Sequence, residues 1–205
     1  MLETLSRVEV VERMTAKEFF RRAPEDRKAE LIDGVMIMPS PPTDRHEKLQ
    51  IFLLRLIGEY AEWLDLGEVR GSSTAVELAE DRVAEPDVLF VARARANIIG
   101  DAGVFGAPDL VVEVLSASTA AYDRGPKFRA YERAGVRELW LIDPYGPAGT
   151  EFYQCAGDIF KPVMPDARGF VHSVALSGFK LNTSWLWPRD KFVSVREALE
   201  AMGDA

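Results

Sequence analysis

Apolar residues recur every three or four positions between residues 44 and 65. This spacing puts one apolar stripe on a long helix and predicts that the stripe faces a core. Thr43 or Asp44 supplies a capping side chain at its start. Gly67 is expected to end the helix, since glycine is common just after the last helical turn.

Strand-like runs of residues follow this helix. They begin at Glu68, Arg82 and Pro108, and the third run is almost continuously apolar. Such a run is typical of a central strand that is buried on both faces. Residues 92–107, between the second and third runs, contain glycine and are basic at their start, so we expect a loop or a short helical insertion there.

A second helix is expected after Ser116. Asp123 is a suitable cap near its start, Pro126 fits its first turn, and Gly135 fits the position after its last turn. The sequence ELWLIDP then predicts a fourth strand. Residues 44–143 therefore read as a helix, three strands, a helix and a strand.

Shorter elements flank this core on both sides. Thr15 and Glu18 have capping-box spacing for a helix to about residue 23, and Asp33-Gly34 predicts a hairpin turn. Residues 144–205 suggest antiparallel strands, and Ser194 starts a terminal helix. We therefore expect one α/β domain over 1–205 with a mixed sheet, comprising an N-terminal extension (1–43), a core (about 44–143) and a C-terminal addition (144–205).

The charge balance and the apolar content of the sequence exclude some classes of protein. The 205 residues include 25 Lys and Arg against 33 Asp and Glu, so the net charge is −8. This excludes a protein that binds nucleic acid through general basicity, although a local basic groove stays possible. The sequence contains neither a long apolar run nor a secretory leader pattern, and Cys155 is its one cysteine. We expect a soluble cytoplasmic protein without a membrane partner.

Carboxylates on strands are the strongest chemical signal. Alternation along the strand after Pro108 puts Asp109 and Glu113 on one face. Asp87 precedes another apolar run, and a buried carboxylate needs a hydrogen bond, an ion pair or a cation. Oxygen ligands favour a hard cation such as Mg²⁺. Ordinary ion pairs at strand ends explain the same pattern, and spacing does not decide between the two.

Lys127 lies near the start of the second predicted helix, where it could contact a phosphate or an attacking water. A solvated basic helix face is the competing interpretation. We prefer that interpretation for Arg129 and Arg133, whereas for Lys127 both remain open.

Several strings resemble the Uma-two family of restriction-endonuclease-like proteins, which belongs to the PD-(D/E)XK nuclease superfamily. They occur in the order AELIDG, PSPPTDRHEKL, EPDVLFV, APDLVVEVLS and STAAYDRGPKFRAYERAGVRELWLIDP. The resemblance runs from about residue 15 to residue 143 and is most specific after residue 108. The superfamily fold, a helix, three strands, a helix and a strand, matches the order read above.

The resemblance implies that Asp87 and Glu113 are catalytic acids and metal ligands, with the Val114 carbonyl as a third ligand. The superfamily lysine belongs two residues after the second acid, but Leu115 occupies that position. The family supplies this lysine from the following helix, where Lys127 is the matching residue.

Other family positions near the expected pocket are Glu30 and His46. Glu30 is expected to orient a ligand or water, while His46 is expected either to contact phosphate or carry a proton, or simply to cap or pack. Asp109 is expected to support Glu113 from about two pleats away. A local basic rim for nucleic acid is expected from Arg93, Arg95 and Arg124.

The leading hypothesis is a Mg²⁺-dependent endonuclease that hydrolyses DNA phosphodiester bonds, with Mn²⁺ as a substitute metal. The first alternative is a catalytically weak or inactive nuclease fold that binds nucleic acid or protein. The second is a structural or regulatory domain with no metal affinity. A homodimer that cuts both strands is expected for a restriction-type nuclease. Trp185, Trp187 and Phe192 fit either its interface or burial within one chain.

Overall fold

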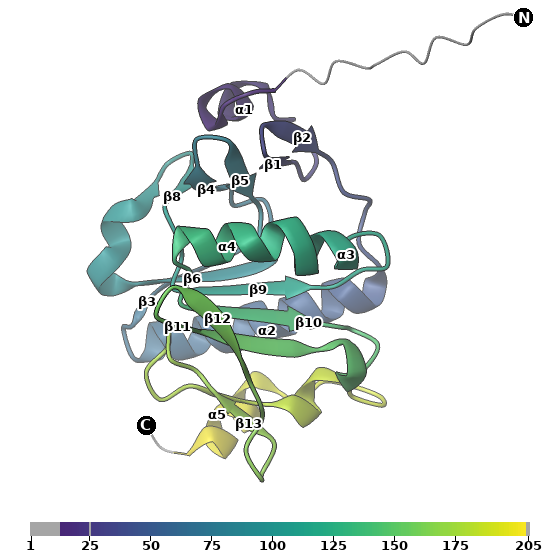
Figure 1. The fold of residues 1–205 in the computed structure, drawn as a ribbon. Helices are drawn as coiled ribbons and strands as arrows, with labels where there is room; N and C mark the ends of the chain where they lie inside the picture. Colours follow the sequence, from purple (N-terminus) through teal and green to yellow (C-terminus); the bar gives the residue numbers. More distant parts are fainter. Residues whose placement is uncertain (1–12, 25, 204–205) are drawn as a thin grey trace, which may run out of the picture.

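The computed structural model describes residues 13–24 and 26–203. Of its two six-stranded sheets, the one with the longer strands, called the larger sheet, forms the centre of the molecule (Figure 1). Strands β9 and β10 of this sheet are parallel, and its other neighbouring strands are antiparallel. Every residue of β9 is buried, which confirms the predicted central strand. The sheet order is β12-β11-β10-β9-β6-β3, formed by β3 (Gly67–Gly71), β6 (Val88–Ala92), β9 (Leu110–Val114), β10 (Glu138–Ile142), β11 (Glu151–Ala156) and β12 (Ile159–Val163).

Helices cover both faces of the larger sheet (Figure 1). On one face, α2 (Asp44–Trp63) and α5 (Val195–Met202) pack with alternate residues of β9, including Val112, into one hydrophobic cluster. On the other face, α4 (Phe128–Ala134) packs with Val111 and Leu115 in a second cluster. The order of the elements along the chain confirms the predicted fold class. It is α2, β3, β6, β9, the α4 segment and β10.

The ends of α2 agree only in part with the prediction. The Thr43 hydroxyl accepts a 3.3 Å hydrogen bond from the His46 backbone N–H, so Thr43 is the cap. The prediction that Gly67 ends the helix was wrong, because the helix ends at Trp63 and Asp65 turns the chain with φ +54°. Gly67 instead begins β3, where a Cβ atom would lie 2.1 Å from the Val91 carbonyl oxygen.

The second predicted helix also begins earlier than expected. It runs through α3 (Ala120–Tyr122), a π-helical turn η2 (Asp123–Lys127) and α4, so Asp123 lies inside it rather than at its cap. Pro126 lacks the N–H that a regular α-helix would use, which suits it to an irregular turn. Gly135 ends α4 with φ +87°, as the sequence predicted.

A smaller sheet packs beside the larger one, at the top of Figure 1. The hairpin at Asp33-Gly34 is confirmed, with φ angles of +49° and +78°. The helix that precedes this sheet, α1 (Ala16–Arg22), has the predicted capping box. The order is β2-β1-β5-β4-β8-β7, with β1 (Glu30–Ile32), β2 (Val35–Ile37), β4 (Val76–Ala79), β5 (Arg82–Ala84), β7 (Ile99–Gly100) and β8 (Gly103–Phe105).

The runs from Glu68 and Arg82 were each predicted as one strand, and the structure divides each between the two sheets. The first run turns at Ser73, which has φ +71°, and the second is interrupted at Glu85 and Pro86, since proline cannot donate to a strand ladder. Residues 92–107 hold a short 3₁₀ helix η1 (Arg93–Ile98) together with β7 and β8. The expected helical insertion is therefore present, and it leads into a hairpin that the sequence analysis did not predict.

The C-terminal part adds the expected hairpin β11–β12 and a strand pair formed by β13 (Phe170–His172) and β14 (Lys180–Asn182). Two 3₁₀ turns, η3 (Pro147–Gly149) and η4 (Thr183–Leu186), connect these strands with their neighbours, and α5 has the predicted capping box at Ser194. Within residues 13–24 and 26–203, no helix combines the length and apolar character needed to cross a membrane.

The aromatic residues considered for a dimer interface pack within the chain. Trp185, Trp187 and Phe192 are partly buried against the larger hydrophobic cluster. Phe192 stacks on Phe52 with ring centroids 4.8 Å apart, and the Trp187 indole N–H donates to the Asp143 carbonyl at 2.8 Å. This favours the second of the two interpretations, burial within one chain.

Candidate active site

A cavity of about 220 Å³ lies where the two sheets and α2 meet. Asp87 lies where the chain enters β6, and Glu113 lies in β9. Since Val88 pairs with Val112 in antiparallel register, Asp87 lies beside Glu113, one pair further along. The register thus brings the two predicted acids to one end of adjacent strands.

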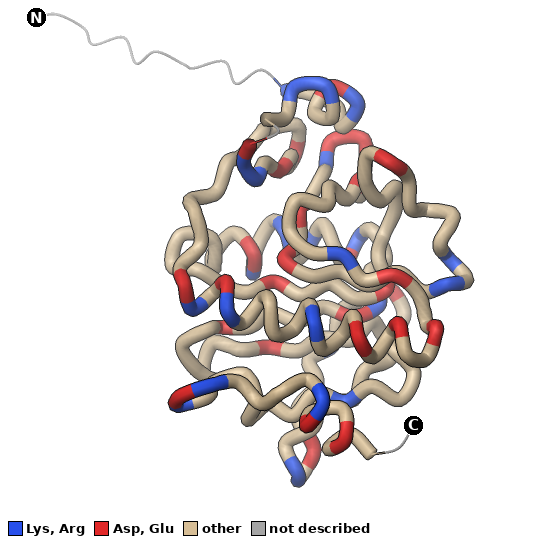
Figure 2. The backbone as a smooth tube through the Cα atoms, turned by 180° about the vertical axis from the view of Figure 1, so that it is seen from behind, with Lys and Arg blue, Asp and Glu red and all other residues tan. Residues whose placement is uncertain are grey.

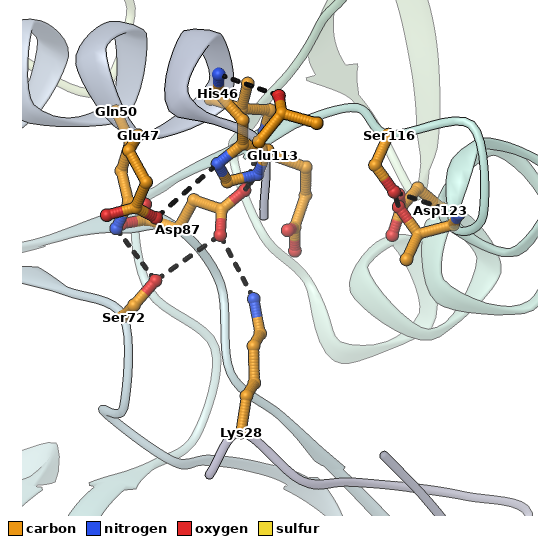
Figure 3. Close-up of polar contacts among 12 residues, drawn as sticks. Lys28, His46, Glu47, Gln50, Ser72, Asp87, Glu113, Ser116 and Asp123 are labelled. Carbon is orange, nitrogen blue, oxygen red and sulfur yellow. Dashed lines mark hydrogen bonds and ion pairs between the residues drawn. The ribbon is translucent and has the colours of Figure 1, made fainter. Parts of the chain in front are cut away.

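Asp87 is 3% exposed and makes contacts through both carboxylate oxygens. Its Oδ2 accepts a 2.8 Å hydrogen bond from the Val114 backbone N–H and lies 3.2 Å from His46 Nε2. Its Oδ1 accepts from Lys28 Nζ at 3.0 Å and from the Ser72 hydroxyl at 3.4 Å. Figure 3 shows that Lys28 and His46 approach this carboxylate from opposite sides.

Glu113 is equally buried and has different partners. Its Oε1 accepts a hydrogen bond from the Tyr131 hydroxyl at 2.5 Å and lies 2.8 Å from Lys127 Nζ. Lys127 also lies 2.7 Å from Glu30 Oε1, which in turn accepts from the Glu85 backbone N–H at 3.0 Å. The predicted lysine and three predicted acids, Glu30, Asp87 and Glu113, therefore line one cavity.

Four-residue spacing along the second helical segment directs several side chains toward Glu113. Asp123, Lys127 and Tyr131 follow one another at this interval, with Asp123 Oδ1 3.7 Å from Lys127 Nζ. In a regular α-helix each such step rotates about 40°, because 3.6 residues make one turn. The wider π turn between Asp123 and Lys127 offsets part of that rotation.

Sequence reasoning missed some of the residues that contact these acids. Lys28 was not singled out, although it lies two residues before Glu30 and extended chains place such residues on the same side. Tyr131 was also missed, although it lies one helical turn after Lys127. Gln50 donates to the Ser72 hydroxyl at 2.8 Å and to the Asp87 carbonyl at 3.1 Å, and no local pattern marked it.

Asp109 does not reach the cavity, which corrects the expectation that it supports Glu113. It is fully buried at the opposite end of β9, where its Oδ2 accepts from the Ala92 backbone N–H at 2.8 Å. Its Oδ1 lies 3.0 Å from Arg95 and 3.5 Å from Arg137. Sharing a strand face was not sufficient, because the cavity lies only at the C-terminal end of the strand.

The structure does not bring the three predicted rim arginines to the cavity. Arg93 is ion-paired with Asp65, and Arg95 is engaged with Asp109 and with the Ala107 carbonyl. Arg124 donates to the Gly149 carbonyl at 2.5 Å. In Figure 2, basic positions are dispersed among acidic ones, apart from a short group in α1. Contacts of these arginines with nucleic acid stay a prediction.

The two acids have opposite pKa shifts. Burial alone would raise the pKa of Asp87, but Lys28 and His46 outweigh burial and lower it well below its usual range. Burial raises the pKa of Glu113 to about 8, and Lys127 only partly opposes this. Although burial disfavours an ammonium, Glu113 and Glu30 raise the pKa of Lys127 well above its usual value. Asp87 is therefore held as an anion, whereas burial favours the neutral form of Glu113.

The donor chemistry fits a hard divalent cation. Asp87 and Glu113 line the cavity with carboxylate oxygens, and the Val114 carbonyl would be a third oxygen ligand, which is the donor set that a hard divalent cation prefers. Across residues 13–24 and 26–203, no group of three His, Cys, Asp or Glu side chains is arranged to hold a metal ion. An ion at Asp87 and Glu113 would therefore have few protein ligands, and Mg²⁺ usually keeps several waters.

Comparison with known proteins agrees with this fold. The family model described as "Uma2: Putative restriction endonuclease" matches residues 16–183. An uncharacterized Synechocystis protein, sll1609, is 30% identical over 152 residues, covering 71% of this chain and 82% of that protein. A crystal structure from Anabaena variabilis, titled as a putative nuclease of DUF820, superposes with a TM-score of 0.65. It is 16% identical and covers 92% of this chain and 99% of that one, so it supports the fold alone.

The mixed sheet between helices matches the nuclease-like fold of that structure. The chain belongs to the Uma2 family, whose model carries the description "Putative restriction endonuclease". This confirms the resemblance that the sequence strings predicted.

Proposed function

We propose that this protein is a Mg²⁺-dependent endonuclease that hydrolyses phosphodiester bonds in DNA, with Mn²⁺ as a substitute metal. The observation that carries the proposal is the convergence of Asp87 and Glu113 from adjacent strands on one cavity with a lysine beside them. Family membership supports the nuclease class.

Asp87, Glu113 and the Val114 carbonyl would hold the metal ion. When bound, the ion supplies an activated water and stabilises charge on the phosphate oxygens. The chain itself keeps the two carboxylates in place. The Val114 N–H orients Asp87, while Tyr131 and Lys127 orient Glu113.

Cleavage of plasmid DNA by the full chain tests this proposal. We expect nicked or linear product with Mg²⁺ or Mn²⁺ and none with EDTA. D87N and E113Q should each lower the rate at least about 100-fold, since each removes a ligand of the metal. D158N is the matched control, because Asp158 is exposed in the loop between β11 and β12. Metal-independent cleavage, or full activity in both variants, would refute the proposal, and a parallel RNA substrate tests the choice of DNA.

A second candidate function is DNA binding without cleavage. Leu115 favours it, because this position would carry the superfamily lysine and here is 3% exposed within a hydrophobic cluster. This candidate predicts binding with steep salt dependence and no product in either metal. A homodimer that cuts both strands also stays a prediction, which the molecular mass in solution with and without DNA would test.

A further inference from the structure

Two lysines line the cavity, and their surroundings differ. Lys127 has a side chain that is only 2% exposed, and its ammonium faces Glu30 at 2.7 Å, Glu113 at 2.8 Å and Asp123 at 3.7 Å. A lysine ammonium has three N–H donors and no acceptor. Glu30 and Glu113 lie within hydrogen-bonding distance of this ammonium and Asp123 lies farther away, so Lys127 is enclosed by carboxylates of the protein and its buried side chain is poorly placed to reach a substrate.

Lys28 is the more accessible lysine. Its side chain is 26% exposed, and its Nζ lies 3.0 Å from Asp87 Oδ1. In the part of the chain that the structure describes, Asp87 is the one residue within hydrogen-bonding distance of this ammonium. Lys28 thus has N–H donors to offer to a ligand that enters the cavity beside Asp87.

The charge of the cavity favours such a donor. Glu30, Asp87, Glu113 and Asp123 all line it, and these carboxylates repel a phosphate. Leu115, at the superfamily's usual lysine position, packs into the hydrophobic cluster beneath α4. Lys28 is the accessible lysine that can offset this repulsion next to the acid Asp87.

We propose that Lys28 is the catalytic residue that contacts the DNA phosphate, whereas Lys127 is a positioning residue that holds Glu113 and Glu30. This inference rests on the proposed nuclease function. The ammonium of Lys28 donates to a non-bridging phosphate oxygen, where negative charge increases as the water oxygen bonds to phosphorus. One phosphorus–oxygen ester bond then breaks. The water loses a proton to solvent, and the departing oxygen takes one up from solvent.

Substitution of each lysine separates the two roles. K28Q removes the ammonium that pairs with the buried Asp87, so its melting temperature should fall somewhat. Assayed below that temperature, it should lower kcat at least about 100-fold, as loss of an oxyanion donor does. K28R should retain part of the activity, since arginine also donates to phosphate. Without metal, in EDTA, fluorescence anisotropy of a labelled DNA duplex should show a salt dependence reduced by about one phosphate contact in K28Q.

K127Q should behave differently from K28Q. It removes the cation between two buried carboxylates, so its melting temperature and its calorimetric affinity for Mn²⁺ should change. Its DNA binding in EDTA, and the salt dependence of that binding, should stay as in the unsubstituted protein. K161Q is the matched control, since Lys161 is exposed on β12.

Two results would overturn the assignment. One is a K28Q protein with unchanged kcat and unchanged salt dependence, and the other is loss of the phosphate contact in K127Q instead of K28Q. If the unsubstituted protein cleaves no DNA, the proposed hydrolysis fails. A reduced salt dependence in K28Q would then still support the contact between Lys28 and phosphate.

Discussion

The backbone N–H of Val114 donates a 2.8 Å hydrogen bond to Oδ2 of Asp87. Because Val114 directly follows Glu113 in β9, this bond fixes one acid relative to the other through the main chain. The separation of the two carboxylates therefore depends on sheet register rather than on side-chain freedom. Two carboxylates held at a fixed separation are suited to act as two ligands of one ion.

Mn²⁺ should raise the melting temperature of the unsubstituted protein, because an ion that binds only the folded state stabilises it. At 100 times the dissociation constant the gain is about 2.7 kcal/mol. D87N should lose most of this shift, whereas D158N should keep it. Differential scanning fluorimetry over a Mn²⁺ titration measures both, and an equal shift in D87N would exclude Asp87 as a ligand.

Y131F should destabilise the protein and reduce cleavage. Tyr131 is 1% exposed, and its hydroxyl donates a 2.5 Å hydrogen bond to Glu113. Loss of this donor should lower the free energy of unfolding by about 1–2 kcal/mol. Urea unfolding and plasmid cleavage are the measurements. Y145F is the control, since Tyr145 is 63% exposed, and wild-type behaviour of Y131F in both assays would show that the bond has no such role.

E138A should be among the most destabilising substitutions outside the cavity. Glu138 is fully buried, and its carboxylate accepts from the Ser173 hydroxyl at 2.6 Å and from the backbone N–H groups of Val174 and Ala175. Its other oxygen accepts from the Trp140 indole at 2.8 Å. Leaving these donors unpaired should cost about 3 kcal/mol by urea unfolding.

E59A serves as the control for E138A. Glu59 is exposed on α2, where its pairing with Arg55 at 3.4 Å contributes little. A free energy of unfolding for E138A within about 0.5 kcal/mol of that for E59A would contradict the predicted role of Glu138.

Titration of Glu85 should contribute to the pH dependence of the free energy of unfolding. Burial raises the pKa of Glu85 to about 7, and its Oε2 is buried without a hydrogen-bonding partner. The native state therefore binds a proton that the unfolded chain releases near its ordinary pKa of 4.5. Between about pH 4.5 and 7 the free energy of unfolding should fall as pH rises.

Urea unfolding in EDTA at several pH values measures this trend. E85Q should remove the contribution of Glu85, so its stability relative to the unsubstituted protein should increase with pH across that interval. E80Q, at an exposed glutamate, should run parallel to the unsubstituted protein. A constant difference between E85Q and the unsubstituted protein would show that Glu85 does not titrate in this interval.

Local patterns predicted much of the fold because they report local physics. The apolar stripe of α2, the Asp33-Gly34 turn and the buried run of β9 each depend on neighbours in sequence. The division of strands between two sheets was not predictable in this way. A turn at Ser73 or an interruption at Pro86 shows where a run breaks, but not which sheet receives the next strand.

The site residues show the same limit. Strand and helix patterns pointed to Asp87, Glu113 and Lys127, family strings added Glu30, and the cavity contains them all. Asp109 was misplaced, because alternation gives the face of a strand but not the position of a cavity along it. Lys28 was missed since its partner, Asp87, lies 59 positions away in sequence.

The two sheets contribute opposite halves of the cavity. Glu30 begins β1 of the smaller sheet and Lys28 lies two residues before it, whereas Asp87 directly precedes β6 and Glu113 lies in β9 of the larger sheet. The two sheets must therefore pack together before the cavity can act on a substrate. Loosening the smaller sheet would withdraw both partners from the acids while every strand of the larger sheet stayed intact. Mutations at the contact between the two sheets should then abolish activity at a much smaller loss of stability than is needed to unfold the protein.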